Sequence, residues 1–120
     1  MQIKKIYNNN IAMVKNEAGD EVILVGKGIV FGLKKGDEIQ AEKAEKKFEL
    51  KGEAKHKFEK MIQDTPIDYI LVSEEIIAYF KEHSTKALND GIYVTLTDHI
   101  ANTIERIRMG IDFDMTMLLN

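Results

Sequence analysis

The hydrophobic pattern of this chain changes its period close to residue 55, and this change limits the folds that the chain can adopt. Before that point, short apolar segments are separated by turn-forming Asn, Gly and Asp residues. After it, apolar residues recur at the three- and four-residue spacing of helices. Short strands joined by tight turns favour an antiparallel sheet. The sequence therefore predicts an α+β chain, with a four-stranded antiparallel β-sheet domain in residues 1–55 and an incomplete all-α helical bundle in residues 56–120.

The first half is expected to form four strands and a further short edge strand. The expected strands are residues 2–7, 11–14, 21–25 and 29–31, and the expected edge strand covers residues 47–50. Asn8 to Asn10 and Asn16 to Asp20 supply the turns, because Asn tolerates left-handed backbone and Gly19 can take a positive φ. A sheet of about fifty residues has a thin core, so we expect this domain to form a homodimer that covers its apolar face.

The second half is expected to form helices, each with a stripe of apolar residues, after a linker at residues 51–55. Thr65 is expected to cap the helix that follows, with Pro66 in its first turn. Residues 89–91 interrupt the pattern, and Met109 with Gly110 is expected to end the last stripe. A further apolar periodicity begins at Ile111 and stops with the chain, so the bundle looks incomplete. The stripe members are Phe58, Met61, Ile62, Ile67, Ile70, Leu71, Ile76, Ile77, Phe80, Leu96, Ile100, Thr103, Ile104 and Ile107.

Composition excludes several classes of protein. The chain has no Cys, which rules out disulfides and thiolate zinc sites, and three scattered His residues do not suggest another metal site. No segment approaches the length of a membrane span and no signal peptide opens the chain, so we expect no membrane insertion and a cytoplasmic location. The net charge of −3 is uneven: residues 1–55 contain 11 Lys and 9 Asp or Glu, and residues 56–120 contain 6 Lys or Arg and 11 Asp or Glu. This asymmetry indicates two units with different partners.

A Gly-Lys-Gly tripeptide after the third expected strand is the clearest candidate site. Gly26 and Gly28 flank Lys27, which would let the backbone approach an anionic partner, and Phe31 could stack on a flat one. Stacking and close backbone approach are typical of single-stranded or looped RNA recognition. The spacing fits neither a P-loop nor the dinucleotide-binding fingerprint. From composition alone, a structural bulge that joins two strands is favoured over a binding loop at this point. The Asn8 to Asn10 turn also has two interpretations. It is either a plain hairpin turn or a site whose Asn side chains form hydrogen bonds with base edges.

No arrangement of residues suggests catalysis. Paired carboxylates such as Glu74 and Glu75 lack a nucleophile or metal context. His99 lies beside Asp98 at the edge of an apolar helical stripe, where a histidine is most often a packed or surface residue. The functional alternative is a titrating or phosphorylatable imidazole. We therefore expect no enzyme activity, no cofactor and no metal.

In their order along the chain, these motifs resemble the BglG/LicT-type transcriptional antiterminators of bacterial sugar operons. The matching stretches are IKKIYNNNIAMVKNEAGDEVILVGKGIVFGLKKGD, VSEEII (residues 72–77) and LNDGIYVTLTDHI (residues 88–100). The resemblance implies an N-terminal homodimeric RNA-binding domain that binds an antiterminator hairpin in nascent mRNA and prevents a competing terminator. It also implies helical regulatory domains that sugar phosphotransferase-system proteins phosphorylate on histidines.

The resemblance also implies roles for individual residues. The RNA-contacting positions of the family fall on Lys5, Asn10, Gly26, Lys27, Gly28 and Phe31, and the first regulatory histidine falls on His99. The family often has Arg at the position of Lys27, and lysine keeps the charge without the planar fork. The chain holds roughly the first half of one regulatory domain. The alternative hypothesis is a phosphotransfer or protein-interaction module that uses His99, with the sheet serving only for dimerisation.

Overall fold

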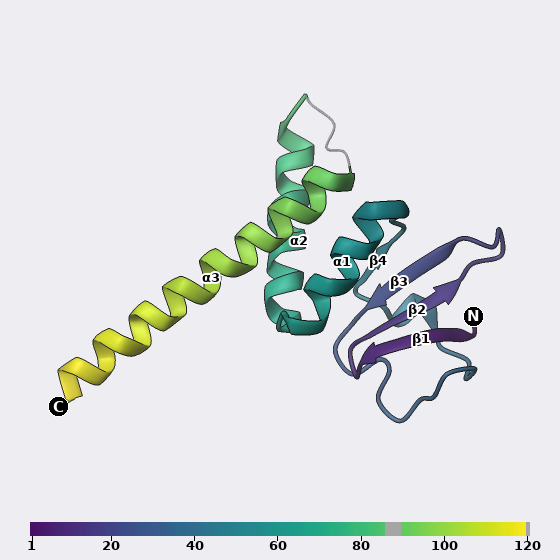
Figure 1. Cartoon of the computed structure of the whole chain (residues 1–120), viewed down its shortest axis with the longest axis horizontal. Helices are drawn as coiled ribbons and strands as arrows, with labels where there is room; N and C mark the ends of the chain where they lie inside the picture. The colour runs from purple at the N-terminus through teal and green to yellow at the C-terminus, as the bar shows by residue number, and fades with distance from the viewer. Residues whose placement is uncertain (86–89, 120) are drawn as a thin grey trace.

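The described part of the chain contains four antiparallel strands and three α-helices (Figure 1). The computed structural model describes residues 1–85 and 90–119. The strands are β1 (Ile3–Asn8), β2 (Ile11–Lys15), β3 (Glu21–Val25) and β4 (Lys46–Phe48), and they lie in the order β1-β2-β3-β4 within one sheet. The expected α+β class with a four-stranded antiparallel sheet is confirmed. Asn8 to Asn10 forms the β1–β2 turn, and Gly19 takes a φ of +85° in the β2–β3 turn.

Both faces of the sheet are covered within one chain. Side chains alternate along β2 and β3, so each strand sends apolar groups to both sides. One face packs against Phe58 and Ile62 of α1 (Gly52–Asp64). The other face packs against Val30 and Ile39, which come from the long segment between β3 and β4. The face that we expected a second copy to cover is therefore covered here by α1.

The prediction of a strand at residues 29–31 was wrong. These residues form consecutive turns, in which Ile29 N–H donates to Gly26 O at 3.3 Å and Phe31 N–H to Gly28 O at 3.1 Å. Positive φ values of +70° at Gly28 and +78° at Gly32 bend the backbone on both sides of this segment, which prevents extended pairing. The fourth strand is instead the short one predicted near residue 47. The segment before it includes a 3₁₀ helix at Ala41–Lys43.

The helix boundaries differ from those predicted from the sequence. α1 begins at Gly52, so most of the expected linker is helical. The Thr65 hydroxyl does not cap α2 (Ile67–His83) but donates back to Met61 O at 2.7 Å, and Pro66 precedes the first helical residue. α3 (Asp90–Leu119) continues through Gly110, because one glycine costs a helix only about 1 kcal/mol when no proline follows. The predicted interruption of the helical pattern at residues 89–91 begins at Asn89, which lies outside the described residues.

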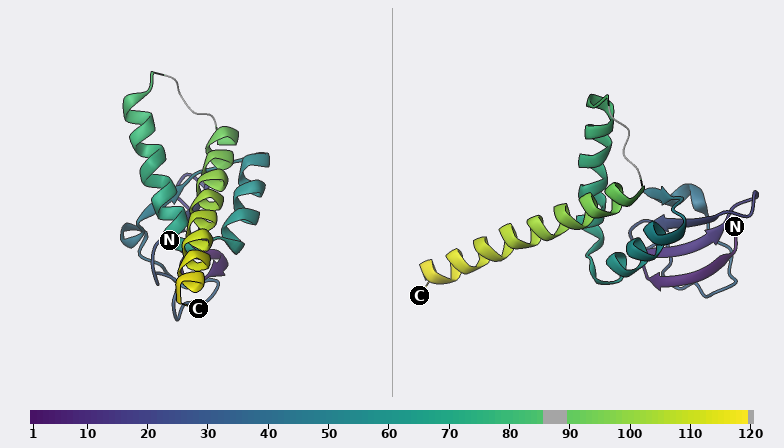
Figure 2. Two further views of the ribbon diagram at one scale, coloured as in Figure 1. Left: turned by 90° about the vertical axis from the view of Figure 1, so that its left-hand side faces the viewer. Right: turned by 45° about the horizontal axis from the view of Figure 1, so that its top comes forward.

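The C-terminal half of α3 projects away from the remainder of the molecule (Figures 1 and 2). Its first half packs against α1 and α2, where Val94 and Ala101 are buried. Its second half exposes large apolar side chains: Ile107, Met109, Ile111, Met115 and Met117. α2 also exposes Ile76 and Phe80. Within the described residues, these apolar side chains are therefore left uncovered by the rest of the chain.

Candidate RNA-binding interface

The β1–β2 turn and the loop that follows β3 are held together through Asn10. The Gly26 N–H donates to the backbone oxygen of Asn10 at 2.9 Å, and the Gly28 N–H donates to the Asn10 side-chain oxygen at 2.8 Å. The Asn10 N–H is in turn bound by the side-chain oxygen of Asn8 at 2.8 Å. Asn10 therefore organises the loop by accepting hydrogen bonds through its backbone and side-chain oxygens, whereas its side-chain NH₂ is a donor group.

Gly26 and Gly28 serve different purposes. Gly26 is buried, and a Cβ there would lie 2.9 Å from Ile29 Cγ2 and 3.3 Å from the backbone nitrogen of Glu45. Gly28 is exposed, has room for a Cβ, and needs its glycine for the positive φ. The first glycine thus allows close packing of the chain on itself. Only the second lies at the surface, where a partner's backbone could approach it.

Lys27, between the two glycines, forms an ion pair with the helical half of the chain. Its Nζ lies 2.7 Å from Oδ1 of Asp68, in the first turn of α2. Hydrogen bonding to Asp68 and the charge of its carboxylate raise the pKa of Lys27, so the ammonium remains charged. The Lys27 N–H also donates to Glu45 Oε2 at 3.0 Å. Both side chains of the ion pair are more than half exposed, so a polyanion could compete with Asp68 for the ammonium.

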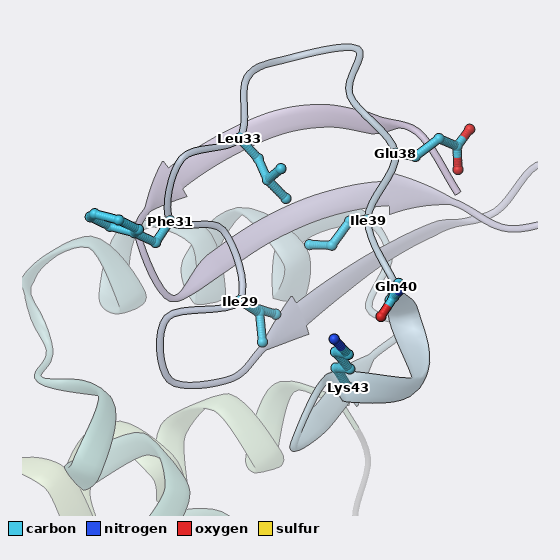
Figure 3. Close-up of a pocket in the computed structure, with 7 residues that line it drawn as sticks. All are labelled: Ile29, Phe31, Leu33, Glu38, Ile39, Gln40 and Lys43. Atoms are coloured by element: carbon cyan, nitrogen blue, oxygen red, sulfur yellow. The ribbon is translucent and has the colours of Figure 1, made fainter.

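Phe31 is 75% exposed, and nothing in the fold accounts for leaving this ring in water. It lies at one side of a hollow of about 290 Å³ (Figure 3). Ile29, Leu33 and Ile39 are directed toward the middle of this hollow, and Gln40 and Lys43 lie at its opposite side (Figure 3). The expectation of an exposed aromatic side chain beside the Gly-Lys-Gly tripeptide is therefore confirmed.

Lys5 belongs to a different contact from the other candidates. It lies on β1, and its Nζ is 3.4 Å from Oε2 of Glu59 on α1 and 5.1 Å from the ring centre of Tyr7. The Tyr7 hydroxyl donates a short hydrogen bond to the same Glu59 carboxylate. Burial raises the pKa of Glu59, but the hydrogen bonds from Tyr7 and Lys5 and the charges of Lys5 and Lys55 outweigh it, so the pKa is lowered overall.

His99 lies on the exposed surface of the first half of α3. Leu96 and Ile100 beside it are half-buried, so the predicted place at the rim of an apolar stripe is confirmed. Its backbone oxygen accepts a hydrogen bond from the Thr103 hydroxyl at 2.8 Å. Asp98 lines a surface pocket together with Lys57 and Lys60 of α1. An exposed imidazole of this kind is accessible to a phosphoryl donor.

The structure thus joins Asn10, Gly26 and Gly28 directly, and Lys27 and Phe31 belong to the same loop. Lys5 is instead paired with Glu59. Sequence reasoning missed Glu59 and Asp68, the carboxylates that hold the two candidate lysines. No local signal could reveal them, because each pair joins residues that are 41 or more positions apart.

Two negative findings apply to the part of the chain that is described. Within residues 1–85 and 90–119, no helix has the length and apolar character needed to cross a membrane. Across the same residues, no three His, Asp or Glu side chains come together as metal ligands would.

Comparison with known proteins assigns a class to each half of the chain. Residues 1–57 match the model of the CAT RNA binding domain, and residues 74–120 match the model of the PRD domain. The first match covers the sheet, its loops and the start of α1, and the second covers the later part of α2 and α3; residues 58–73 belong to neither. The class is therefore that of proteins in which a CAT RNA-binding domain precedes a PRD domain.

Individual relatives define the family. The transcription antiterminator LicT of Bacillus subtilis is 43% identical over 119 residues, which are 98% of this chain and 43% of LicT. The beta-glucoside operon antiterminator of Dickeya chrysanthemi is 34% identical over 113 residues, which are 93% of this chain and 40% of that protein. The crystal structure of GlcT CAT-PRDI superposes with a TM-score of 0.67 at 34% identity, covering 91% of this chain and 66% of that one. The chain belongs to the LicT/BglG-type family of transcriptional antiterminators, and it spans less than half the length of the curated relatives named here.

Proposed function

We propose that this chain binds a hairpin in nascent mRNA and so acts in transcriptional antitermination of a sugar-utilisation operon. The observation that carries this proposal is the loop built on Asn10. It presents an exposed glycine backbone at Gly28, a cation at Lys27 and a bare aromatic ring at Phe31 within the segment that matches an RNA-binding domain. Looped RNA offers unstacked bases and phosphates, which these groups fit.

Each group has a distinct role in such a complex. Phe31 stacks on an unpaired base, and the free amide NH₂ of Asn10 donates to a base edge. Lys27 meets a phosphate after it leaves Asp68, and Gly28 allows close backbone approach. Lys5 would add a phosphate contact once Glu59 releases it. Gly26 acts indirectly, because it is buried and supports the loop.

The proposed mechanism is the stabilisation of one RNA fold against another. A protein that binds only the antiterminator hairpin shifts the competition between that hairpin and a terminator by its binding free energy. A tenfold shift in such an equilibrium needs about 1.4 kcal/mol, so moderate affinity is enough to change the outcome of transcription. No reacting group is required for this action, and we assign the chain no enzyme activity and no cofactor.

The experiment is a gel shift with a bulged RNA hairpin and an unrelated duplex as competitor. Phe31→Ala should weaken binding by about 1–3 kcal/mol, the range for loss of one base–aromatic stack. Phe80→Ala is the matched control, because Phe80 is 55% exposed but lies on α2, away from the loop. Equal affinity of wild type for hairpin and duplex would reject specific hairpin binding. It would then favour a protein-interaction module that uses His99.

Regulation is proposed at His99. A phosphoryl group on this exposed imidazole would add negative charge next to Asp98, which should alter the packing of α3 on its neighbours. The expected donor is a sugar phosphotransferase-system protein, and the expected effect is inhibition of antitermination when the inducing sugar is absent. Mass spectrometry of acid-labile phosphate after incubation with a phosphorylated permease domain tests the site. Label on the exposed His56 or His83 in place of His99 would contradict it.

The remaining parts of the proposal concern assembly and place of action. We propose a homodimer as the RNA-binding form, with residues 1–55 as the RNA-binding domain and residues 56–120 as the start of the regulatory domain. The face of the sheet now under α1 is apolar and could serve as a dimer surface if α1 moved. Sedimentation of the chain with and without the hairpin tests the dimer. Binding to nascent mRNA implies a cytoplasmic location.

A further inference from the structure

The hollow beside Phe31 combines an apolar floor with a polar side. The floor is made by Ile39, which is 5% exposed, and by the half-buried Ile29 and Leu33. Gln40 and Lys43 lie at the polar side, with the 3₁₀ helix that carries Lys43 (Figure 3). Glu38 also lines the hollow (Figure 3). Its carboxylate forms an ion pair with the terminal ammonium of Met1 at 2.9 Å.

The dimensions and chemistry of the hollow select a small, flat and partly polar occupant. Its volume of about 290 Å³ is just below the roughly 300–1,000 Å³ typical of small-molecule sites. The floor offers dispersion contacts to a planar ring. The Gln40 amide offers a donor and an acceptor side by side, which is the pattern that pairs with the edge of a nucleobase.

We propose that this hollow receives an unpaired RNA base next to the base that stacks on Phe31. The inference rests on the proposed RNA-binding function and names a second base site within it. The base lies on Leu33 and Ile39 with its edge toward the Gln40 amide. The Lys43 ammonium lies at the same side, where it meets the phosphate of that nucleotide.

The position of the hollow supports an RNA base over a free metabolite. Phe31 belongs both to the Asn10-built loop and to the rim of the hollow, so the two sites are continuous. An unpaired strand that stacks one base on Phe31 places the next nucleotide within reach of the hollow. RNA-binding surfaces commonly accept splayed bases in this way, with stacking and edge hydrogen bonds combined.

The test uses the full chain and an RNA hairpin selected for binding to it from a pool with randomised loop positions. Each unpaired position is then replaced by an abasic nucleotide, in wild type and in Gln40→Ala. One abasic position should lower wild-type affinity by about tenfold or more, and the same replacement should have little further effect in Gln40→Ala. Gln63→Ala on the exposed surface of α1 is the matched control and should leave the abasic effect unchanged.

Three further measurements complete the test. 2-Aminopurine at the coupled position should change its emission on binding to wild type and less so on binding to Gln40→Ala. Lys43→Ala should reduce the slope of log affinity against log salt by about one unit, whereas Lys15→Ala should not. Free adenosine monophosphate should bind only weakly, at millimolar concentration or above; micromolar binding in the absence of RNA would point to a metabolite site and overturn the proposal.

The outcomes separate this inference from the function on which it rests. If no RNA is selected from the pool, the proposed function fails. If an RNA is selected and Phe31→Ala weakens it, but no abasic position is coupled to Gln40, the function stands and the second base site is wrong.

Discussion

Lys27 and Asp68 connect the loop after β3 to the first turn of α2, with 2.7 Å between Nζ and Oδ1. The same lysine is a candidate phosphate contact, so under the proposed function Asp68 and RNA would compete for one ammonium group. Lys5 stands in the same relation to Glu59. The helical half therefore holds both candidate phosphate-binding lysines of the sheet domain with carboxylates in this structure.

Asp68→Asn should increase RNA affinity because it frees Lys27 without removing it. We expect an increase of roughly two- to fivefold at low salt, as for the loss of one exposed ion pair, and a smaller effect at high salt. Fluorescence anisotropy with a labelled hairpin measures this. Asp64→Asn removes the same charge from the exposed C-terminal end of α1 and controls for general electrostatics. Equal increases for both variants would show that Asp68 does not act through Lys27.

Glu59 should contribute stability that depends on pH. Its pKa is lowered in the folded protein, so its contribution is present above the pKa of the unfolded chain, about 4.3, and is lost as pH falls through the folded value. Glu59→Gln should therefore destabilise the protein at pH 7, by an amount on the order of 1 kcal/mol for a charge-assisted hydrogen bond. The difference from wild type should shrink below pH 4.

Urea unfolding at several pH values measures the contribution of Glu59. Glu53→Gln is the control, because Glu53 is on the same helix but 83% exposed, with one ion pair to Lys57. A difference between wild type and Glu59→Gln that stayed constant from pH 7 to pH 3 would show that the carboxylate charge is not responsible.

Gly26→Ala should damage the loop. The added Cβ would lie 2.9 Å from Ile29 Cγ2 and 3.3 Å from the backbone of Glu45, so the loop must shift. We expect a loss of about 1–3 kcal/mol of stability, as for overpacking, together with weaker RNA binding. Gly110→Ala in α3 is the opposite case, because nothing lies within 4 Å and alanine favours a helix by about 1 kcal/mol. Thermal unfolding and anisotropy measure both variants, and a neutral Gly26→Ala would disprove the close packing.

Phe58→Ala should destabilise the whole chain. Phe58 is fully buried between the sheet and the helices, and its ring centre lies 4.7 Å from that of Phe48 on β4. Loss of such a side chain costs about 3–5 kcal/mol through the cavity that it leaves. Phe80→Ala, on the exposed side of α2, should change the free energy of unfolding by no more than about 0.5 kcal/mol. Comparable effects for the two variants in urea would mean that α1 does not pack on the sheet as described.

The strands and most of the turns could be predicted from local patterns. The alternation around Ile3 and Ile6 and the apolar runs Ile11 to Val14 and Val22 to Val25, with Asn-rich and Gly19 turns between them, are sufficient to define β1 to β3. The segment at residues 29–31 was misjudged, because its apolar residues look like a strand. Only the glycines on each side of it, with their positive φ values, make it a series of turns.

The candidate site was predicted in its residue types and only partly in its arrangement. The Gly-Lys-Gly tripeptide, Asn10 and Phe31 stand out in the sequence. The positive φ of Gly28 is a consequence of this local sequence. The bond from Gly28 N–H to the Asn10 side chain is not local, and neither is the burial of Gly26 under residues 44 and 45. These depend on which turns meet at one end of the sheet.

The sequence by itself determined the antiparallel sheet, the change to helices, and the exposed aromatic and basic residues, because periodicity and turn chemistry act over a few residues. Tertiary structure alone decided that α1 covers the apolar face of the sheet and that Glu59 and Asp68 hold Lys5 and Lys27. The physical reason is that charges and apolar faces far apart in the chain become partners only after the helices have packed. The sequence contains these charged and apolar residues, but it has no local pattern that predicts which of them become partners.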